Sequence, residues 1–139
     1  MSEIRRSQQN ENLTQAILAV INIKPGIRLA ILFGSLAAGR ERADSDLDLA
    51  VDAGHRLTAG EKLALLTELA ERTGRPVDLV DLQVVGEPLL GQILRHGNRL
   101  LGSETCYADL IRKHLLDQAD YLPYRNRILA ERRRVWIGK

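Results

Sequence analysis

The sequence predicts an α/β (α+β) domain in which a small sheet is flanked by helices and followed by a helical tail. Short apolar segments of strand length alternate along the chain with longer segments whose apolar residues recur every three or four positions. The composition is that of a folded domain, with 45% hydrophobic and 27% charged residues, and 139 residues give room for one domain.

The first helix and strand are marked by apolar spacing and by a Pro-Gly stop. Residues 11–22 are expected to form an amphipathic helix, which Pro25-Gly26 ends. Residues 27–33 are expected to form a buried strand, since most of this segment is an unbroken apolar run. The apolar face of the helix consists of Leu13, Ile17, Val20 and Ile21.

A turn and a polar loop connect this strand to the next one. Gly34-Ser35 is expected to form a tight turn, and residues 36–38 a short helical turn. A charged loop follows over 40–45, and residues 47–51 are expected to form the second strand.

The next helix has the clearest start signal in the chain. Thr58 and Glu61 form a capping box for a helix over 58–72, and Gly74 ends it. Residues 77–82 are expected to form the third strand. The apolar stripe of the helix is expected to consist of Leu63, Leu66, Leu69 and Ala70.

The remaining elements are a short helix, an edge strand and the tail. A helix is expected over 88–96, with Leu89, Leu90, Ile93 and Leu94 as its core face, followed by an edge strand over 99–101. From Thr105 onward the chain is expected to be helical, and Pro123 either kinks this helix or lies in the first turn of a new one. Its apolar positions are Leu110, Ile111, Leu115 and Leu116.

The polar N-terminus and the single cysteine indicate a cytoplasmic protein. No apolar run of the signal-peptide kind follows the first residues, and no run approaches the roughly 20 apolar residues of a membrane helix. Cys106 is the only cysteine, so no internal disulfide and no cysteine-based zinc cluster is expected. His55, His96 and His114 fall on separate elements without ligand spacing, so we interpret them as surface or helix-end residues.

Charge is distributed unevenly along the chain. From Arg112 to the end, eight Lys and Arg residues face three Asp and Glu residues, a net charge of +5. The whole chain carries +2, which leaves −3 for residues 1–111. This split indicates an acidic site in the body and a basic tail that meets an anionic partner, although a solvated helical face would have the same composition.

Asp46 and Asp48 are the first candidates for chemistry. On a strand, alternate side chains share a face, so the two carboxylates project from one side, roughly 7 Å apart at their Cα atoms. Two like charges on one sheet face raise each other's pKa unless a cation lies between them. A divalent ion such as Mg²⁺ takes oxygen ligands of this kind.

A third carboxylate and a phosphate-binding turn complete the candidate site. Asp78 and Asp81 interrupt an apolar strand, and because they face opposite sides only one is expected to join the first pair; we favour Asp78, with Asp81 as the alternative. Gly34-Ser35 permits close approach of a phosphate before a short helical segment. Arg40 is a further candidate for neutralising phosphate charge.

Gly34-Ser35, followed after ten residues by Asp46-Leu47-Asp48, resembles the signature of the DNA polymerase β-type nucleotidyltransferase superfamily, and the short chain resembles its minimal nucleotidyltransferase (MNT) branch. The resemblance covers about residues 25–104 and implies a small mixed sheet. It also implies that Asp46, Asp48 and Asp78 hold two Mg²⁺ ions, with ATP as nucleotide donor. Members of the branch often carry an arginine in the Gly-Ser helix turn, where Leu36 and Ala38 stand here.

The resemblance further implies an antitoxin. Proteins of this branch are commonly paired with a HEPN-domain ribonuclease toxin, which they silence by transferring AMP from ATP to a tyrosine hydroxyl of the toxin. Residues 1–104 would form the minimal nucleotidyltransferase domain, and the basic helical tail, 105–139, would dock on the partner. The alternatives are nucleotidyl transfer to RNA or to an antibiotic hydroxyl, and a non-catalytic antitoxin that acts by binding alone. Nucleic-acid binding by the tail is not favoured, because aromatic residues are sparse among its basic residues.

Overall fold

The computed structural model describes residues 2–24, 26–37 and 45–137. Helices and strands alternate along the chain, and most described ends agree with the sequence-based expectation to within two residues. The elements are α1 (Ser2–Ile21), β1 (Leu29–Phe33), α2 (Gly34–Ala37), β2 (Leu47–Asp52), α3 (Ala59–Thr73), β3 (Val77–Asp81), α4 (Leu89–His96), β4 (Asn98–Gly102) and α5 (Glu104–Ile137).

The four strands form one mixed sheet in the order β3-β2-β1-β4. β1 lies antiparallel to both of its neighbours, β2 and β4, whereas β2 and β3 run parallel. The parallel pair is connected through α3, as a parallel connection requires a crossover element. The predicted fold class, a small mixed sheet with flanking helices and a C-terminal helix, is confirmed.

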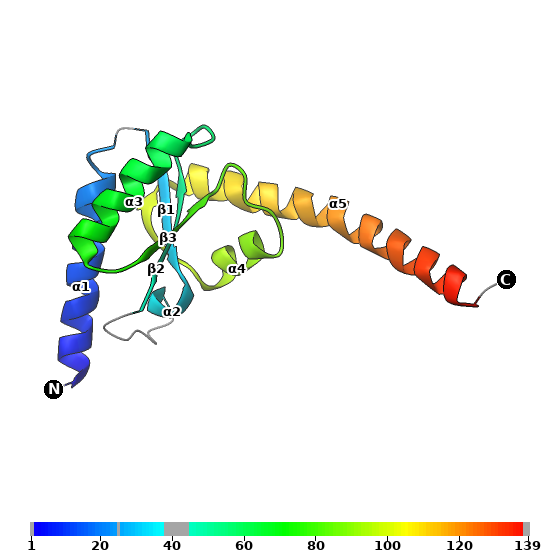
Figure 1. Cartoon of the computed structure of the whole chain (residues 1–139), viewed down its shortest axis with the longest axis horizontal. Coiled ribbons are helices and arrows are strands. Elements are labelled where there is room, and N and C mark those ends of the chain that lie inside the picture. The colour runs from blue at the N-terminus through cyan, green and yellow to red at the C-terminus, as the bar shows by residue number, and fades with distance from the viewer. Residues whose placement is uncertain (1, 25, 38–44, 138–139) are drawn as a thin grey trace.

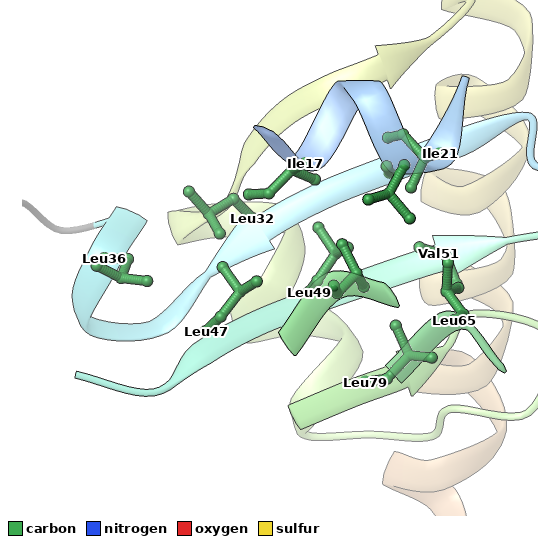
Figure 2. Close-up of a cluster of buried hydrophobic side chains, with 12 residues drawn as sticks. Ile17, Ile21, Leu32, Leu36, Leu47, Leu49, Val51, Leu65 and Leu79 are labelled. Carbon is green, nitrogen blue, oxygen red and sulfur yellow. The ribbon is translucent and has the colours of Figure 1, made fainter. Parts of the chain in front are cut away.

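One face of the sheet packs against α1 and α3 (Figure 1). Side chains from both helices and from β1, β2 and β3 fill this core, which Figure 2 shows in close-up. Burial of this aliphatic surface is the main favourable contribution to stability on this side, at about 1.5–3 kcal/mol for each fully buried Leu, Ile or Val. The labelled members are Ile17, Ile21, Leu32, Leu36, Leu47, Leu49, Val51, Leu65 and Leu79.

The opposite face is covered by α4 and by the first turns of α5. Leu90 and Ile93 of α4 are buried there, as expected from the apolar face of that helix. Leu110 is the buried residue that α5 contributes. The same cluster includes Leu29, Ile31, Ala50, Leu82 and Val85.

The predicted cap of α3 is confirmed, but its predicted stripe is wrong at one position. The Thr58 Oγ1 accepts a hydrogen bond from the Glu61 N–H at 3.1 Å, and the Glu61 carboxylate accepts one from the Thr58 N–H at 3.0 Å. Leu63 is exposed, whereas Leu65 is buried beside Leu69. The two faces of a Leu-rich helix cannot be told apart by apolarity alone, so the orientation is set by the sheet that it covers.

α1 is longer than predicted, and α5 forms one continuous helix. α1 begins at Ser2, nine residues before the predicted start, because residues 2–10 include good helix formers such as Glu, Arg and Gln but only one large apolar residue, Ile4, and so show no apolar stripe. α5 runs through Pro123 without ending. A proline leaves the carbonyl four residues earlier without its N–H partner, and here that carbonyl belongs to Ala119, an exposed residue that water can reach.

Figure 1 shows α5 leaving the domain and extending well beyond the sheet. Within the part of the chain that the structure describes, every helix is too short or too polar to cross a membrane.

Candidate active site

The ends of three strands meet at one end of the sheet. Because β1 runs antiparallel to β2, the last residue of β1, Phe33, pairs with Asp48 near the start of β2. Because β2 runs parallel to β3, Asp48 also pairs with Asp78 near the start of β3. Gly34 follows Phe33 directly, so the Gly-Ser turn and two carboxylates lie together at this end.

Asp48 and Asp78 project from the sheet face that α4 and α5 cover. Their strand neighbours Leu47, Leu49 and Leu79 point into the core beneath α1 and α3. Since successive side chains on a strand alternate faces, the two aspartates point the other way. The predicted alternation along β2 is therefore confirmed.

The Asp48 carboxylate packs directly against Gly34. Gly34 has φ of 76°, a left-handed conformation that favours glycine. A Cβ atom built at this position would lie 3.0 Å from the Asp48 Cγ and would collide with a carboxylate oxygen. The glycine thus serves both the turn and the close approach of a carboxylate to its backbone.

The electrostatic environment of Asp48 is unfavourable to its charge. Burial raises the pKa of the Asp48 carboxyl, and the negative charges of Asp78 and then Asp46 raise it further. Asp46, one residue before β2, is exposed. The structure therefore brings Asp46 and Asp78 near enough to Asp48 to raise its pKa.

Asp81, the alternative third carboxylate, has a different environment. Its side chain accepts hydrogen bonds from the Leu57 N–H at 2.8 Å and from the Gln83 N–H at 2.9 Å. Only 7% of the residue is exposed. Asp81 thereby fixes the loops before α3 and after β3, and it is Asp78 that the fold places beside Asp48.

The Gly-Ser turn opens the four-residue helix α2. Ser35 is half-buried, and Leu36 is buried in the core beneath α1 and α3. The Asn98 side chain donates a hydrogen bond to the Ala37 carbonyl at 3.4 Å and so ties α2 to β4. Arg40, the predicted phosphate-neutralising residue, lies outside the described residues.

A residue that the sequence reasoning missed holds the start of β2. The Arg75 guanidinium donates a hydrogen bond to the Ser45 carbonyl at 3.1 Å, just before Asp46. The Leu47 N–H donates to the Pro76 carbonyl at 2.8 Å and closes the same strand end. Its partner is a backbone carbonyl, so no pattern of side chains in the sequence indicated this contact.

The histidines do not approach this site. His55 pairs with Glu61 at 3.0 Å at the start of α3, and His96 is exposed at the end of α4. His114 was interpreted as a surface or helix-end residue, and this was wrong. It lies within α5 and is largely buried, and its Nδ1 forms a hydrogen bond with the Glu87 carboxylate.

Residues 15–105 of the chain match the family described as Polymerase beta, Nucleotidyltransferase. The chain belongs to this family. The match begins within α1 and ends at the start of α5, so it contains every described residue of the site.

Relatives within the nucleotidyltransferase family identify the branch. The protein adenylyltransferase MntA of Shewanella oneidensis is 36% identical over 97 residues, which cover 70% of this chain and 68% of the relative. A toxin–antitoxin crystal structure with AMP-PNP contains a chain that is 27% identical, with a TM-score of 0.76 over 85% of this chain and 96% of that one. The MntA–HepT toxin–antitoxin structure contains a chain that is 27% identical, with a TM-score of 0.67 over 89% and 97%. The resemblance to an MNT antitoxin is confirmed.

The three carboxylates of this nucleotidyltransferase have the donor chemistry of a magnesium site. As placed, no three His, Cys, Asp or Glu side chains of the described residues are close enough to hold a metal ion. Asp46, Asp48 and Asp78 nevertheless offer only carboxylate oxygens, which suit Mg²⁺. The repulsion that raises the Asp48 pKa is what a divalent cation would offset. The residues fit such an ion if its binding draws their side chains together.

Proposed function

We propose that this chain is an antitoxin enzyme that transfers AMP from ATP to a tyrosine hydroxyl of a cognate HEPN ribonuclease toxin and thereby neutralises it. The observation that carries the proposal is the Asp48 carboxylate, packed against Gly34 and repelled by Asp78 and Asp46. Membership of the nucleotidyltransferase family and 36% identity to a protein adenylyltransferase supply the reaction class. Relatives solved as toxin–antitoxin structures, one of them with AMP-PNP, support a protein partner and an adenine nucleotide.

Each site residue has a distinct role in the proposed reaction. Asp46 and Asp48 would hold two Mg²⁺ ions, and Asp78 would complete one of the two sites. Bound Mg²⁺ would polarise the α-phosphate and offset the charge of the leaving pyrophosphate. Gly34 and Ser35 would hold the triphosphate through the backbone N–H groups and the hydroxyl of the turn. Arg40 would neutralise phosphate charge beside them.

The transfer itself is a displacement at the α-phosphorus of ATP. The tyrosine oxygen forms a bond to this phosphorus while the bond to the bridging oxygen breaks, and pyrophosphate leaves with the electron pair. The tyrosine proton passes to the Asp78 carboxylate. Little covalent work is left to the protein, so the rate depends on positioning and on neutralising charge.

The packing of Leu36 bears on how phosphates are held. Where the branch often carries an arginine, this chain has Leu36, which is buried in the core. Leu36 therefore anchors α2 and cannot contact a phosphate. Phosphate charge on that side then depends on Arg40 and on the metal ions.

We also infer that the protein works in the cytoplasm, where ATP and a ribonuclease toxin are both present. The single, half-buried Cys106 is consistent with a reducing compartment.

The proposal is tested with ATP labelled on its α-phosphate. The purified chain is incubated with Mg²⁺, labelled ATP and the HEPN-domain protein encoded beside it, and the acceptor residue is mapped by mass spectrometry. Label on a toxin tyrosine supports the proposal. Label on RNA or on an antibiotic would favour one of the other acceptors. Inhibition of the toxin without any label would identify a binding antitoxin.

A variant pair distinguishes chemistry from mere association. Asp46→Asn combined with Asp48→Asn should fold, because repulsion is relieved, and should lose transfer. Asp109→Asn removes an exposed carboxylate on α5, outside the site, and should transfer AMP like the unmodified chain. Unchanged transfer by the double variant would refute the assignment.

A further inference from the structure

α5 is fixed to the domain along one side over its first turns. The Tyr107 hydroxyl donates a hydrogen bond to the Leu94 carbonyl at 3.4 Å, and Leu110 is buried in the core. The Lys113 ammonium donates to the Val85 carbonyl at 2.9 Å. His114, one residue further, pairs with Glu87. These anchors recur at intervals of three or four residues, so they share one side of the helix.

The side of α5 that faces away from these anchors carries large aliphatic residues. Leu115 and Leu116 are 58% and 61% exposed, and Ile111, at the edge of this side, is 37% exposed. At 3.6 residues per turn, Leu115 and Leu116 lie on either side of the direction opposite Leu110. Exposed Ala119 lies between them. We refer to Ile111, Leu115, Leu116 and Ala119 as the outer row. Nothing among the described residues covers it, and exposed apolar rows of this kind mark contact surfaces.

The outer row lies in a segment that toxin–antitoxin relatives share. The general nucleotidyltransferase match ends at residue 105. The match to the AMP-PNP structure spans 85% of the 139 residues, so it ends no earlier than about residue 118. The similarity to this toxin–antitoxin structure therefore extends beyond the catalytic domain and through Leu115 and Leu116.

The positive charge of the tail indicates what kind of partner fits the outer row. From Arg112 onward the chain carries a net charge of +5. Two copies that paired their α5 helices in parallel would bring these charges together, which disfavours a self-interface. A partner with an apolar groove bordered by acidic residues would satisfy both the outer row and the basic tail.

We propose that the outer row of α5 is the docking surface for the cognate HEPN toxin. This inference rests on the proposed function, which supplies the partner. The anchors at Tyr107, Leu110, Lys113 and His114 set the direction of the helix. α5 covers the same sheet face from which Asp48 and Asp78 project, so a toxin on the outer row lies on the same side of the sheet as these carboxylates.

The test compares two leucine variants with a matched control. Leu115→Glu combined with Leu116→Glu places two charges on the outer row, whereas Leu63→Glu places one on α3, where Leu63 is 65% exposed. Binding of the purified HEPN-domain protein is measured by isothermal titration calorimetry, and helix content by circular dichroism. We expect the outer-row variant to bind at least about 30-fold more weakly, as for residues at the centre of an interface, and Leu63→Glu to bind normally.

Each result has one interpretation. If the toxin is modified by the unmodified chain but binds the outer-row variant equally well, the docking proposal is overturned and the proposed function stands. If the unmodified chain neither binds nor modifies the toxin, the proposed function fails, and this inference fails with it. If light scattering shows that the chain alone is a dimer which the outer-row variant dissociates, the row is a self-interface and the proposal is wrong.

A second measurement separates docking from chemistry. Binding of AMP-PNP to the outer-row variant should match that of the unmodified chain, because α5 residues 115 and 116 lie outside the site. Asp46→Asn combined with Asp48→Asn should show the opposite behaviour, with toxin binding kept and transfer lost. If the outer-row variant loses AMP-PNP binding together with toxin binding, the substitutions have damaged the fold. That result would contradict a docking role.

Discussion

The two ends of β2 shift the pKa of an aspartate in opposite directions. Asp48 and Asp52 lie on the same strand and the same sheet face. Burial alone would raise the pKa of Asp52, but hydrogen bonds from Gln83 and from the Gly54 N–H, with the Arg28 ion pair, hold it below its usual range. Burial raises the pKa of Asp48, and the charges of Asp78 and Asp46, which act on it among the described residues, raise it further.

This contrast separates a carboxylate that supports the fold from one that is available for ligands. Asp52 has its partners built into the protein, so its charge is compensated in the folded chain. Asp48 is held beside like charges by strand pairing and by Gly34, and under the proposed function a bound cation would compensate those charges. Compensation by the protein, and not the presence of an acidic residue, is what distinguishes the two positions.

The largest expected effect comes from neutralising each aspartate in turn. Asp48→Asn should lower AMP transfer about 10³-fold, since a proposed metal ligand is lost, without lowering the free energy of unfolding. Asp52→Asn should leave transfer per folded molecule nearly unchanged but reduce the free energy of unfolding by about 2 kcal/mol, because hydrogen bonds to a charged group are lost. Transfer assays and urea unfolding measure the two quantities, and equal behaviour of the two variants would contradict the comparison.

Gly34→Ala should disturb the Asp48 end without touching a carboxylate. A Cβ here meets the Asp48 side chain and must adopt a left-handed φ, which costs about 1–2 kcal/mol. Displacing a catalytic group by about 1 Å lowers rates about 10²-fold, so transfer should fall by that order. Gly60→Ala is the matched control, because a Cβ at Gly60 meets open space. If Gly34→Ala retains full transfer, the close approach has no catalytic role.

Arg75→Ala should loosen the start of β2. Without its bond to the Ser45 carbonyl, Asp46 is held less firmly, so we expect about tenfold slower transfer and a higher Mg²⁺ concentration for half-maximal rate. Hydrogen exchange at the Leu47 N–H should also accelerate. Arg72→Ala, which removes an exposed arginine from the last turn of α3, serves as control. Identical magnesium dependence in the two variants would exclude a positioning role for Arg75.

The smallest effect is the pH dependence of stability in the absence of divalent ions. The folded-state pKa of Asp48 is raised, so its contribution is present below the unfolded pKa and lost as the pH rises through the folded pKa. The folded-state pKa of Asp52 is lowered, so its contribution is present above the unfolded pKa, about 3.9, and lost as the pH falls through the folded pKa.

Urea unfolding over this acidic range checks both signs. Relative to the unmodified chain, Asp48→Asn should gain stability as the pH rises, and the penalty of Asp52→Asn should shrink as the pH falls. A penalty that stays constant with pH would mean that Asp52 is not held in its charged form.

Most of the fold was accessible from local patterns. The capping box at Thr58 and Glu61 and the alternation along β2 are sequence signals whose physical cause lies within a few residues. The buried faces of α3 and α5 could not be predicted from local patterns, because Leu63 and Leu115 are as apolar as their buried neighbours. Only the position of the sheet decides which of them is covered.

The sequence also predicted part of the candidate site. The spacing of Asp46 and Asp48 was enough to predict that they lie on the same side of a strand. Because side chains alternate along a strand, only one of Asp78 and Asp81 could be the third carboxylate. The choice between these two depends on the parallel pairing of β2 with β3 and on the hydrogen bonds that occupy Asp81. Arg75 was missed because its partner is a backbone carbonyl, which leaves no trace in the sequence.

The alternation along β2 has a consequence for damaged or partly folded molecules. Leu47, Leu49 and Val51 fill one core while Asp48 and Asp52 occupy the other side. A slip of one residue would put both acids into hydrocarbon, at several kcal/mol each, and the aliphatic side chains into the wrong layer. Folded conformers with β2 in a shifted register are therefore not expected. A substitution that weakens the core should lower the fraction of folded molecules, while the turnover rate of each folded molecule stays normal.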